Sequence, residues 1–581
     1  MKRLLQELKE YKASSIKAPL FMIGEVGLEL SLPTLMAYVI DNGVMIGDMR
    51  TAVLMGLVML VVAFLSLVCG ALSAKNASYA SAGFVKNLRK AMFENIQRFS
   101  FRNVDRYSTA GLITRLMTDT TNVQNAYMMI LRMCVRAPMM LILAMVMTFT
   151  IHADLALYFL YALIFLAVAL TLITVLSYPV FRRVFRKYDD LNASVQENIT
   201  NMRVVKAYVK EEAETKKFKS ASEKLYEMFC KAEKILVLNG PMMQLAMYAC
   251  IMAIGWFGAQ FVVGGSLTTG ELMSMFTYTM QLLMSLMMLS MVFVMVSMST
   301  ASAKRIVEVL EETSDIHNPA KPVYEIADGS IRFENVSFDY YTHEFDKDED
   351  DAVLRNINLE IASGETIGIL GGTGSAKSTL VQLIPRLYDV QKGAVYVGGR
   401  NVKEYDLDTL RNEVAMVLQK NVLFSGTIKD NLRWGNDQAS DEEMIRACRL
   451  AQADEFISRF PDGYDTYIEQ GGSNVSGGQK QRLCIARALL KKPKILILDD
   501  STSAVDTKTD ALIRKAFRED IPDTTKLIIS QRISSIEDAD RIVVLNDGEI
   551  DGIGTHEELL ASNAIYQEIY ETQKKGADDD E

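Results

Sequence analysis

The chain has 581 residues, more than one folding unit usually contains, so at least two domains are expected. Acidic residues outnumber basic ones by 72 to 62, and the formal net charge is -10. A nucleic-acid-binding protein needs a basic surface to neutralise phosphates, so this charge disfavours a nucleic-acid partner. Hydrophobic residues make up 49% of the chain and charged residues still 23%, so the apolar residues must be concentrated in one part of it.

The N-terminal half carries stretches long enough and apolar enough to cross a membrane. Residues 1–17 alternate charges with Leu and Tyr at helical spacing and lack a small-residue cleavage site, which predicts an interfacial amphipathic helix rather than a signal peptide. Uncharged stretches follow at 51–74, 155–181, 235–270 and 272–303, and less uniform ones lie at 18–40 and 137–153. We therefore expect six membrane spans.

The distribution of basic residues predicts which side of the membrane is cytoplasmic. Segments 41–50, 152–154 and 264–271 hold a single base, Arg50, whereas segments 75–136 and 182–234 are rich in Lys and Arg. Cytoplasmic loops carry the excess of positive charge, so both termini are expected in the cytoplasm. The basic segments also have helical periodicity, which predicts long cytoplasmic helical extensions of the spans. A transverse helix is expected at each tip, at 101–109 and 201–210; plain solvated hairpins are the alternative.

The composition changes after Ala303. A charged helix is expected at 304–312, then a Pro-containing linker, then β-branched, Gly-punctuated sequence typical of an α/β domain. The expected division is a six-span transmembrane domain at 1–303, a linker at 304–322, a soluble domain at 323–573 and an acidic tail at 574–581, disordered at its end. The six cysteines form no C-x-x-C pair and are interpreted as buried, reduced side chains.

A glycine-rich loop in the second domain is typical of phosphate binding. The apolar run 366–370 predicts a buried strand, and a helix is expected over 380–388. Between them, backbone N–H groups can surround phosphate oxygens, Lys377 can reach the β and γ phosphates, and Ser378 can bind Mg²⁺. The expected ATP-binding residues here are Gly371, Gly372, Thr373, Gly374, Ser375, Ala376, Lys377, Ser378 and Thr379. Ala376 replaces the usual Gly; its methyl group should be tolerated if the local backbone stays right-handed, and we therefore expect nucleotide binding to survive.

Two further motifs complete this pattern. A second apolar strand at 495–498 ends in Asp499 and Asp500, the position at which a carboxylate orients Mg²⁺. Gln419 follows the strand-like segment 413–418. A helix predicted at 480–491 is preceded by Ser476, Gly477, Gly478 and Gln479, a second anion-binding helix start. Two phosphate-binding ends in one domain imply that nucleotide sites form between two such domains.

These motifs stand in an order that resembles an ATP-binding cassette (ABC) half-exporter over essentially the whole chain. The order downstream of the spans is the glycine-rich loop, Gln419, Val-Ser-Gly-Gly-Gln, the strand ending in two aspartates, and Ser-Ala-Val-Asp at 503–506. The resemblance implies an all-α six-helix transmembrane domain followed by an α/β P-loop NTPase domain, in a bacterial inner membrane. It also implies that Tyr340 stacks on adenine, that Asp506 belongs to the ATP site and that Gln419 joins Mg²⁺ to the membrane helices. Residues 476–479 would embrace the ATP of a partner, and the transverse helices would couple the two domains.

Two departures from the family pattern bear on hydrolysis. Members that hydrolyse briskly have Glu and His where this chain has Asp500 and Gln531. Aspartate is shorter by about 1 Å, and misplacement on that scale can cost roughly a hundredfold in rate. Glutamine cannot shuttle a proton as imidazole can. Because residues 476–479 are intact, the chain resembles the degenerate-site subunit of heterodimeric bacterial multidrug exporters, with catalysis mainly at the site built on the partner's Walker motifs.

Polar groups inside the spans are candidates for a substrate cavity. Glu25 and Glu29 lie one helical turn apart, and intramembrane carboxylates usually face water or a partner, so a cavity lining is expected, with structural pairing as the alternative. Gln244, Tyr278 and Gln281 could add polar contacts among the many methionines of the last two spans. The acidic segment 344–351 is either a cation-binding patch or a solvated loop.

The predicted function is therefore that of an exporter subunit that uses ATP and Mg²⁺ to move small amphipathic or apolar compounds outward across a lipid bilayer. Its expected partner is a second half-transporter. The alternatives are a lipid or peptide exporter subunit, and a nucleotide-gated regulatory subunit that binds ATP without powering transport.

Overall fold

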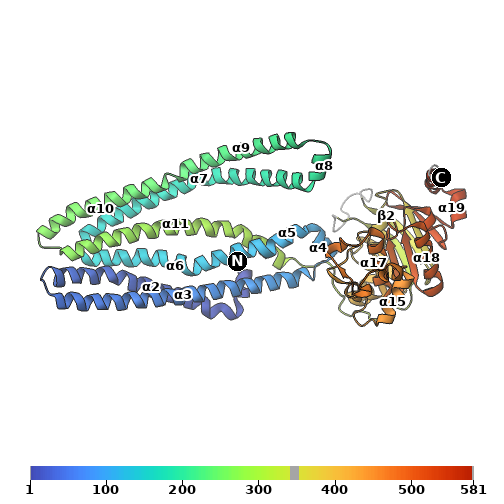
Figure 1. Cartoon of the computed structure of the whole chain (residues 1–581), viewed down its shortest axis with the longest axis horizontal. Helices are drawn as coiled ribbons and strands as arrows, with labels where there is room; N and C mark the ends of the chain where they lie inside the picture. The colour runs from blue at the N-terminus through green and yellow to red at the C-terminus, as the bar shows by residue number, and fades with distance from the viewer. Residues whose placement is uncertain (1, 341–351, 579–581) are drawn as a thin grey trace. The chain divides into compact units, whose positions relative to one another are not determined.

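The computed structural model describes residues 2–340 and 352–578. The chain divides into two compact units: Met1–Gln97 with Thr109–Glu312, and Arg98–Ser108 with Thr313–Glu581. The first is helical and the second contains all the strands of the described residues (Figure 1). The acidic segment 344–351 and residues 579–581 lie outside the described residues. The boundaries proposed from composition, at 303, 322 and 573, stay predictions.

The first unit consists of long helices that carry apolar stretches, and its α9 is rich in charged residues. Its main helices are α2 (Lys12–Tyr38), α3 (Met49–Ile96), α6 (Thr120–Ile151), α7 (Ala153–Thr200), α9 (Glu211–Leu236), α10 (Asn239–Val263) and α11 (Thr269–Glu311). In the described part of the chain, six helical stretches are long and apolar enough to cross a membrane. Exposed apolar faces of this length are stable in hydrocarbon, where a helix satisfies its own backbone hydrogen bonds. The predicted number of spans is confirmed.

The helices of this unit pack as two neighbouring groups. Helices α2, α3, α6 and α11 contact one another, and Val26, Leu30 and Leu282 lie in their shared core. Helices α7 and α9 run side by side and are joined at their tip by α8 (Met202–Ala207) (Figure 1). The transverse helix predicted at 201–210 is therefore present. The one predicted at 101–109 is α4 (Phe101–Arg106), which belongs to the second unit.

The change of composition after Ala303 does not interrupt the helix. Helix α11 continues through the charged segment to Glu311, because this segment contains good helix formers and neither Gly nor Pro. Arg305 in this extension donates two hydrogen bonds to Asp119, at 2.7 and 2.5 Å, and the Asp119 side chain is almost fully buried. The separate helix expected at 304–312 is thus the end of the last spanning helix.

The second unit is built on a largely parallel sheet. Its strand order is β12-β11-β3-β10-β9-β6, and only the β11–β12 pair is antiparallel. The strands are β3 (Thr366–Gly371), β6 (Val414–Val417), β9 (Ile495–Asp499), β10 (Thr525–Ile529), β11 (Arg541–Asn546) and β12 (Glu549–Gly554). Every residue of β9 and β10 is buried, as expected for parallel strands covered on both faces.

An antiparallel sheet and several helices cover this central sheet. The smaller sheet has the order β2-β1-β4-β5, with β1 (Ile331–Phe338), β2 (Leu354–Ile361), β4 (Lys392–Val397) and β5 (Arg400–Asn401). The main helices are α12 (Lys377–Gln382), α13 (Leu407–Glu413), α14 (Ile428–Arg433), α15 (Asp441–Leu450), α17 (Gly477–Leu489), α18 (Thr507–Asp520), α19 (His556–Ser562) and α20 (Ala564–Asp578). Strands β3, β10 and β9 are parallel neighbours, so the segments that follow them meet at one edge of the sheet.

One helix is shorter than predicted. The helix expected over 380–388 is α12, which begins at Lys377 and already ends at Gln382. Pro385 has no N–H to continue the helical hydrogen bonds, and Arg386 has a left-handed backbone with φ 52°. The chain therefore turns before Tyr388 and leaves that ring free to make other contacts.

Candidate nucleotide-binding site

The glycine-rich loop follows β3 and is closed over by its lysine. A Cβ added to Gly371 would lie 2.2 Å from the Leu545 carbonyl oxygen, so a larger residue does not fit there. The Lys377 ammonium donates to the carbonyl oxygens of Gly371 at 2.8 Å and Gly372 at 2.7 Å. Burial lowers the pKa of Lys377, although Asp499 and Asp500 counteract this effect. The loop thus holds the Lys377 ammonium at a position where phosphate oxygens could replace the two carbonyl oxygens as hydrogen-bond acceptors.

Ala376 adopts the backbone conformation that favours glycine. Its φ is 68° and its ψ is 22°, in the left-handed region, immediately before α12 begins. The condition for tolerating the methyl group, a right-handed backbone, is therefore not met at this position. The loop turns sharply between Ser375 and Lys377, and the left-handed conformation costs a residue with a Cβ roughly 1–2 kcal/mol. The alanine therefore introduces strain into the phosphate-binding loop.

The two acidic residues at the end of β9, Asp499 and Asp500, lie beside this loop. Ser378 donates a hydrogen bond of 2.8 Å to Asp499, whose side chain is buried. Burial raises the pKa of Asp499 and of Asp500, while a hydrogen bond from Gln419 partly counteracts this effect at Asp500. The glycine-rich loop, the two carboxylates and Gln419 therefore lie close together. This follows from the strand order, because the strands that carry them lie close together in the sheet. Gln531 follows the neighbouring strand β10, and its side chain is exposed.

Tyr340 is anchored against the start of α12. Its hydroxyl shares a hydrogen bond of 2.9 Å with Thr379, and burial raises its pKa. Its ring packs edge-on against Phe338 at 4.9 Å and Tyr388 at 5.1 Å between ring centroids. The hydrogen bond and the two ring contacts together fix the position of the Tyr340 ring, which is expected to stack on adenine. The family resemblance implies a role for Tyr340 but none for Tyr388, which the sequence pattern places in a predicted helix.

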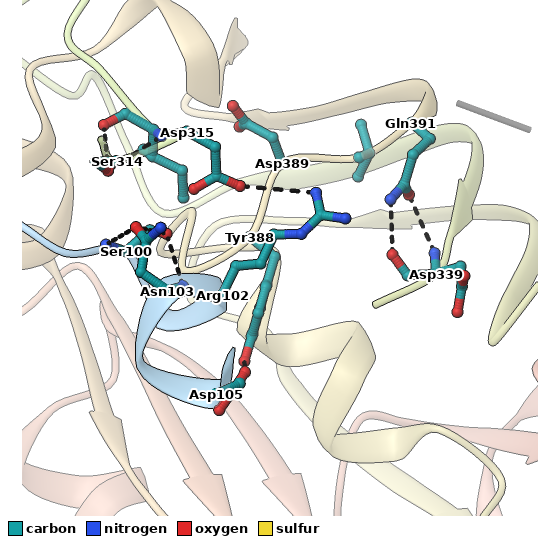
Figure 2. A network of polar contacts seen from close by, with 12 residues as sticks. Ser100, Arg102, Asn103, Asp105, Ser314, Asp315, Asp339, Tyr388, Asp389 and Gln391 are labelled. Carbon is teal, nitrogen blue, oxygen red and sulfur yellow. Dashed lines mark hydrogen bonds and ion pairs between the residues drawn. The ribbon is translucent and has the colours of Figure 1, made fainter. Parts of the chain in front are cut away.

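Tyr388 also contacts the transverse helix α4, as Figure 2 shows. Its hydroxyl donates to Asp105 at 2.5 Å, and its ring meets Phe101 edge-on at 6.0 Å. Elsewhere on α4, Asn103 donates to the Thr313 carbonyl oxygen at 3.2 Å, and Arg102 lies 3.8 Å from Asp315. Tyr388 therefore joins the proposed adenine-stacking ring to α4 within one compact unit. No local sequence pattern predicts these contacts, because they join residues that are far apart in the sequence.

The second predicted phosphate-binding element is a well-formed helix start. Ser476 accepts a hydrogen bond from the Gln479 N–H, and the Gln479 side chain accepts one from the Ser476 N–H, so α17 begins with a capping box. A Cβ added to Gly478 would lie 2.7 Å from the Ala504 carbonyl oxygen, so glycine permits close packing on that segment. Ser476 and Gly477 are exposed, and Asp506 caps α18. The first turn of α17 is thus available to a ligand or partner.

The intramembrane carboxylates are paired. Glu25 and Glu29 on α2 each accept a hydrogen bond of 2.6 Å from Arg136 on α6. The sequence allows structural pairing of these carboxylates, but nothing in it identifies Arg136 as the partner. Tyr278 is fully buried and donates to the Leu30 carbonyl oxygen at 2.8 Å. The two remaining cavity candidates are Gln281, whose side-chain oxygen is buried without a hydrogen-bond partner among the described residues, and Gln244, which is exposed.

Comparisons with known proteins agree with this arrangement. Residues 16–286 match the ABC transporter transmembrane region, and residues 354–503 match the ABC transporter domain. The uncharacterized ABC transporter ATP-binding protein YfiB of Bacillus subtilis is 37% identical over 99% of this chain and 98% of its own length. The chain belongs to the ABC transporter family. Among other relatives of this ABC transporter, an ATP-dependent lipid A-core flippase of Desulfotalea psychrophila is 31% identical over 99% of both chains.

A solved structure shows the same architecture. The structure of a bacterial Atm1-family ABC exporter with ATP bound superposes with a TM-score of 0.83 at 26% identity, covering 97% of this chain and 99% of that one. The predicted fold class is confirmed: a six-helix transmembrane region is fused to an ABC nucleotide-binding domain. The protein is thus an integral membrane ABC half-exporter, driven by ATP.

Proposed function

We propose that this ABC half-exporter works in a heterodimer in which its own nucleotide site hydrolyses ATP weakly. The observation that carries the proposal is that Asp500 and Gln531 follow the adjacent parallel strands β9 and β10, next to the glycine-rich loop. The Asp500 carboxyl is short, and its raised pKa makes it easier to protonate than an ordinary aspartate. Gln531 is neutral at every pH and cannot transfer a proton. The intact start of α17 would instead complete the partner's site.

The residues near the loop fit ATP with Mg²⁺. Ser378, Gln419 and Asp499 would supply oxygen ligands, which Mg²⁺ prefers, and the Ser378–Asp499 hydrogen bond brings two of these side chains together. Bound there, the ion would neutralise the phosphate charge that develops during hydrolysis. Lys377 would release its carbonyl acceptors to bind the phosphates, and Tyr340 would stack on the adenine. The start of α17 would bind the ATP held by the partner.

The transported molecule is proposed to be an amphipathic or apolar compound. Glu25 and Glu29, together with Gln281 and Gln244, are the proposed polar contacts of its path, whereas Tyr278 is fully buried between helices. A lipid is the second candidate, and the full-length similarity to a lipid A-core flippase favours it. In either case the protein would lie in the inner membrane of a bacterium, with both termini and the nucleotide-binding domain in the cytoplasm.

Steady-state ATP hydrolysis by the purified complex tests the assignment of the two sites. Ser476→Arg should nearly abolish turnover, because charge and bulk at the start of α17 would prevent closure over the partner's phosphate. Asp500→Asn should be much milder, because the productive site lies elsewhere. Ser473→Arg adds the same charge just before that turn and serves as the matched control, with assembly and nucleotide binding measured for each variant. Loss of turnover in Asp500→Asn, with Ser476→Arg active, would reverse the assignment.

A further inference from the structure

The C-terminal helix α20 is firmly docked on the nucleotide-binding domain. Tyr566 on this helix is fully buried, and its hydroxyl lies 2.7 Å from Nδ1 of His556. The Tyr566 N–H also donates to the Asn563 side chain at 2.8 Å, which fixes the beginning of the helix. Ile569 and Tyr570, one turn further on, pack on the same hydrophobic core. The next turn of α20 is therefore held at a defined place.

In that next turn, the Gln573 side chain binds the loop that follows β10 on both sides of Arg532. Its Nε2 donates to the Gln531 carbonyl oxygen at 2.6 Å, and its Oε1 accepts from the Ile533 N–H at 3.0 Å. Using both groups of one planar amide in this way resembles the pairing that a neighbouring strand would provide. The Gln531 side chain is exposed, so Gln573 fixes the backbone from which that side chain projects.

Arg532, in the loop that Gln573 holds, also binds segment 503–505, which precedes α18. Its guanidinium donates to the carbonyl oxygens of Ser503 at 2.9 Å and Val505 at 3.3 Å. From the other side, Gln481 of α17 accepts from the Ala504 N–H at 3.0 Å. Segment 503–505 is therefore held between the loop after β10 and the helix whose start is proposed to bind the partner's ATP.

We propose that Gln573 is a positioning residue for ATP hydrolysis: it fixes the loop after β10 and, through Arg532, segment 503–505 beside α17, the helix proposed to complete the partner's productive site. This inference rests on the proposed function, because it assumes that the loop and α17 act at nucleotide sites. Loss of the clamp lets the loop sample other conformations without removing any group that binds nucleotide. The turnover number falls while the apparent affinity for ATP changes little, since positioning acts on the reaction step.

The test compares Gln573→Leu with Thr572→Ala in the full-length transporter, in the assembly in which it is purified. Leucine has a similar volume but neither donates nor accepts, whereas the Thr572 hydroxyl donates to the Glu568 carbonyl oxygen within α20. Hydrogen exchange of the Ile533 amide reports the clamp directly, because that N–H is the donor to Gln573. Gln573→Leu should speed this exchange and lower kcat about three- to tenfold at similar KM, and Thr572→Ala should change neither.

A pair of truncations gives a second reading. A chain that ends at Lys574 keeps Gln573 and should behave like the full-length protein, whereas one that ends at Thr572 should behave like Gln573→Leu. Unchanged exchange at Ile533 in Gln573→Leu overturns the positioning role. Faster exchange with an unchanged kcat overturns its part in hydrolysis. If the unmodified transporter binds no ATP, the proposed function fails, while the exchange experiment still decides whether Gln573 holds the loop.

Discussion

The Tyr388 hydroxyl donates a hydrogen bond of 2.5 Å to the Asp105 carboxylate and thereby joins the segment after α12 to helix α4. The same ring meets Tyr340 edge-on at 5.1 Å. A contact thus runs from the residue proposed to stack on adenine to the helix expected to couple nucleotide binding to transport. Removing the hydroxyl should weaken this coupling and leave nucleotide binding largely intact.

The variant Tyr388→Phe tests this relation, because it keeps the aromatic packing and removes only the hydrogen bond. We expect a loss of about 1 kcal/mol of stability at the contact, ATP binding close to that of the unmodified protein, and weaker stimulation of ATP hydrolysis by transported compounds. Tyr396→Phe is the matched control, since Tyr396 lies under Arg332 on the antiparallel sheet. Full stimulation in Tyr388→Phe would contradict the coupling role.

The left-handed backbone of Ala376 makes a second prediction. Ala376→Gly should relieve the strain and stabilise the nucleotide-binding domain by about 1 kcal/mol, less the entropy that glycine adds to the unfolded chain. The melting temperature of the nucleotide-free protein should rise, and ATP should bind at least as tightly. The opposite change at Gly374→Ala, where φ is 87°, should lower the melting temperature. A lower melting temperature for Ala376→Gly would contradict the strain argument.

The sequence predicted local features of the site better than its long-range contacts. A buried strand followed by glycines, lysine and serine identifies a phosphate-binding loop because all its determinants are adjacent in sequence. Ala376 shows the limit of this reasoning: residue type alone does not give φ, which the turn around the loop imposes. The sequence does not reveal the roles of Arg136 and Tyr388, because their partners, Glu25 and Asp105, lie more than a hundred positions away. Only the packed fold brings such groups together.

The ion pairs of Arg136 lead to a prediction about the membrane domain. Arg136→Gln leaves Glu25 and Glu29 without their cation in a poorly hydrated place, which should cost about 2 kcal/mol after allowance for their partial exposure. The triple variant Arg136→Gln with Glu25→Gln and Glu29→Gln removes all three charges and should be more stable than the single one. Melting temperatures in detergent compare the two. A triple variant that is less stable than Arg136→Gln would show that the charges do not interact.

The buried carboxylates beside the loop predict a pH dependence of metal-assisted binding. The pKa of Asp499 is raised by burial, so this group takes up a proton at a higher pH than an ordinary aspartate, whose pKa is about 3.9. Mg²⁺ needs the ionised form, and therefore Mg²⁺-dependent ATP binding should weaken as the pH falls towards this raised pKa. Asp499→Asn should bind weakly and with a flatter profile. Titration of a fluorescent ATP analogue with and without Mg²⁺ measures the difference.

The last prediction concerns what Asp500 and Gln531 prevent. If a short carboxylate and a neutral amide make this site slow, then Asp500→Glu together with Gln531→His should raise hydrolysis at this chain's own loop, because a longer carboxylate and a proton-transferring imidazole return to adjacent strand ends. Neither change alone should suffice, because the Glu at 500 would position the attacking water whereas the His at 531 would assist the reaction at the phosphate. The gain should disappear when Lys377→Ala is added, because that change disables this loop and leaves the partner's intact. Steady-state ATP hydrolysis of the purified complex, with nucleotide binding checked in each variant, measures the effect. A double variant that hydrolyses no faster than the unmodified complex would mean that something other than these two side chains limits the site.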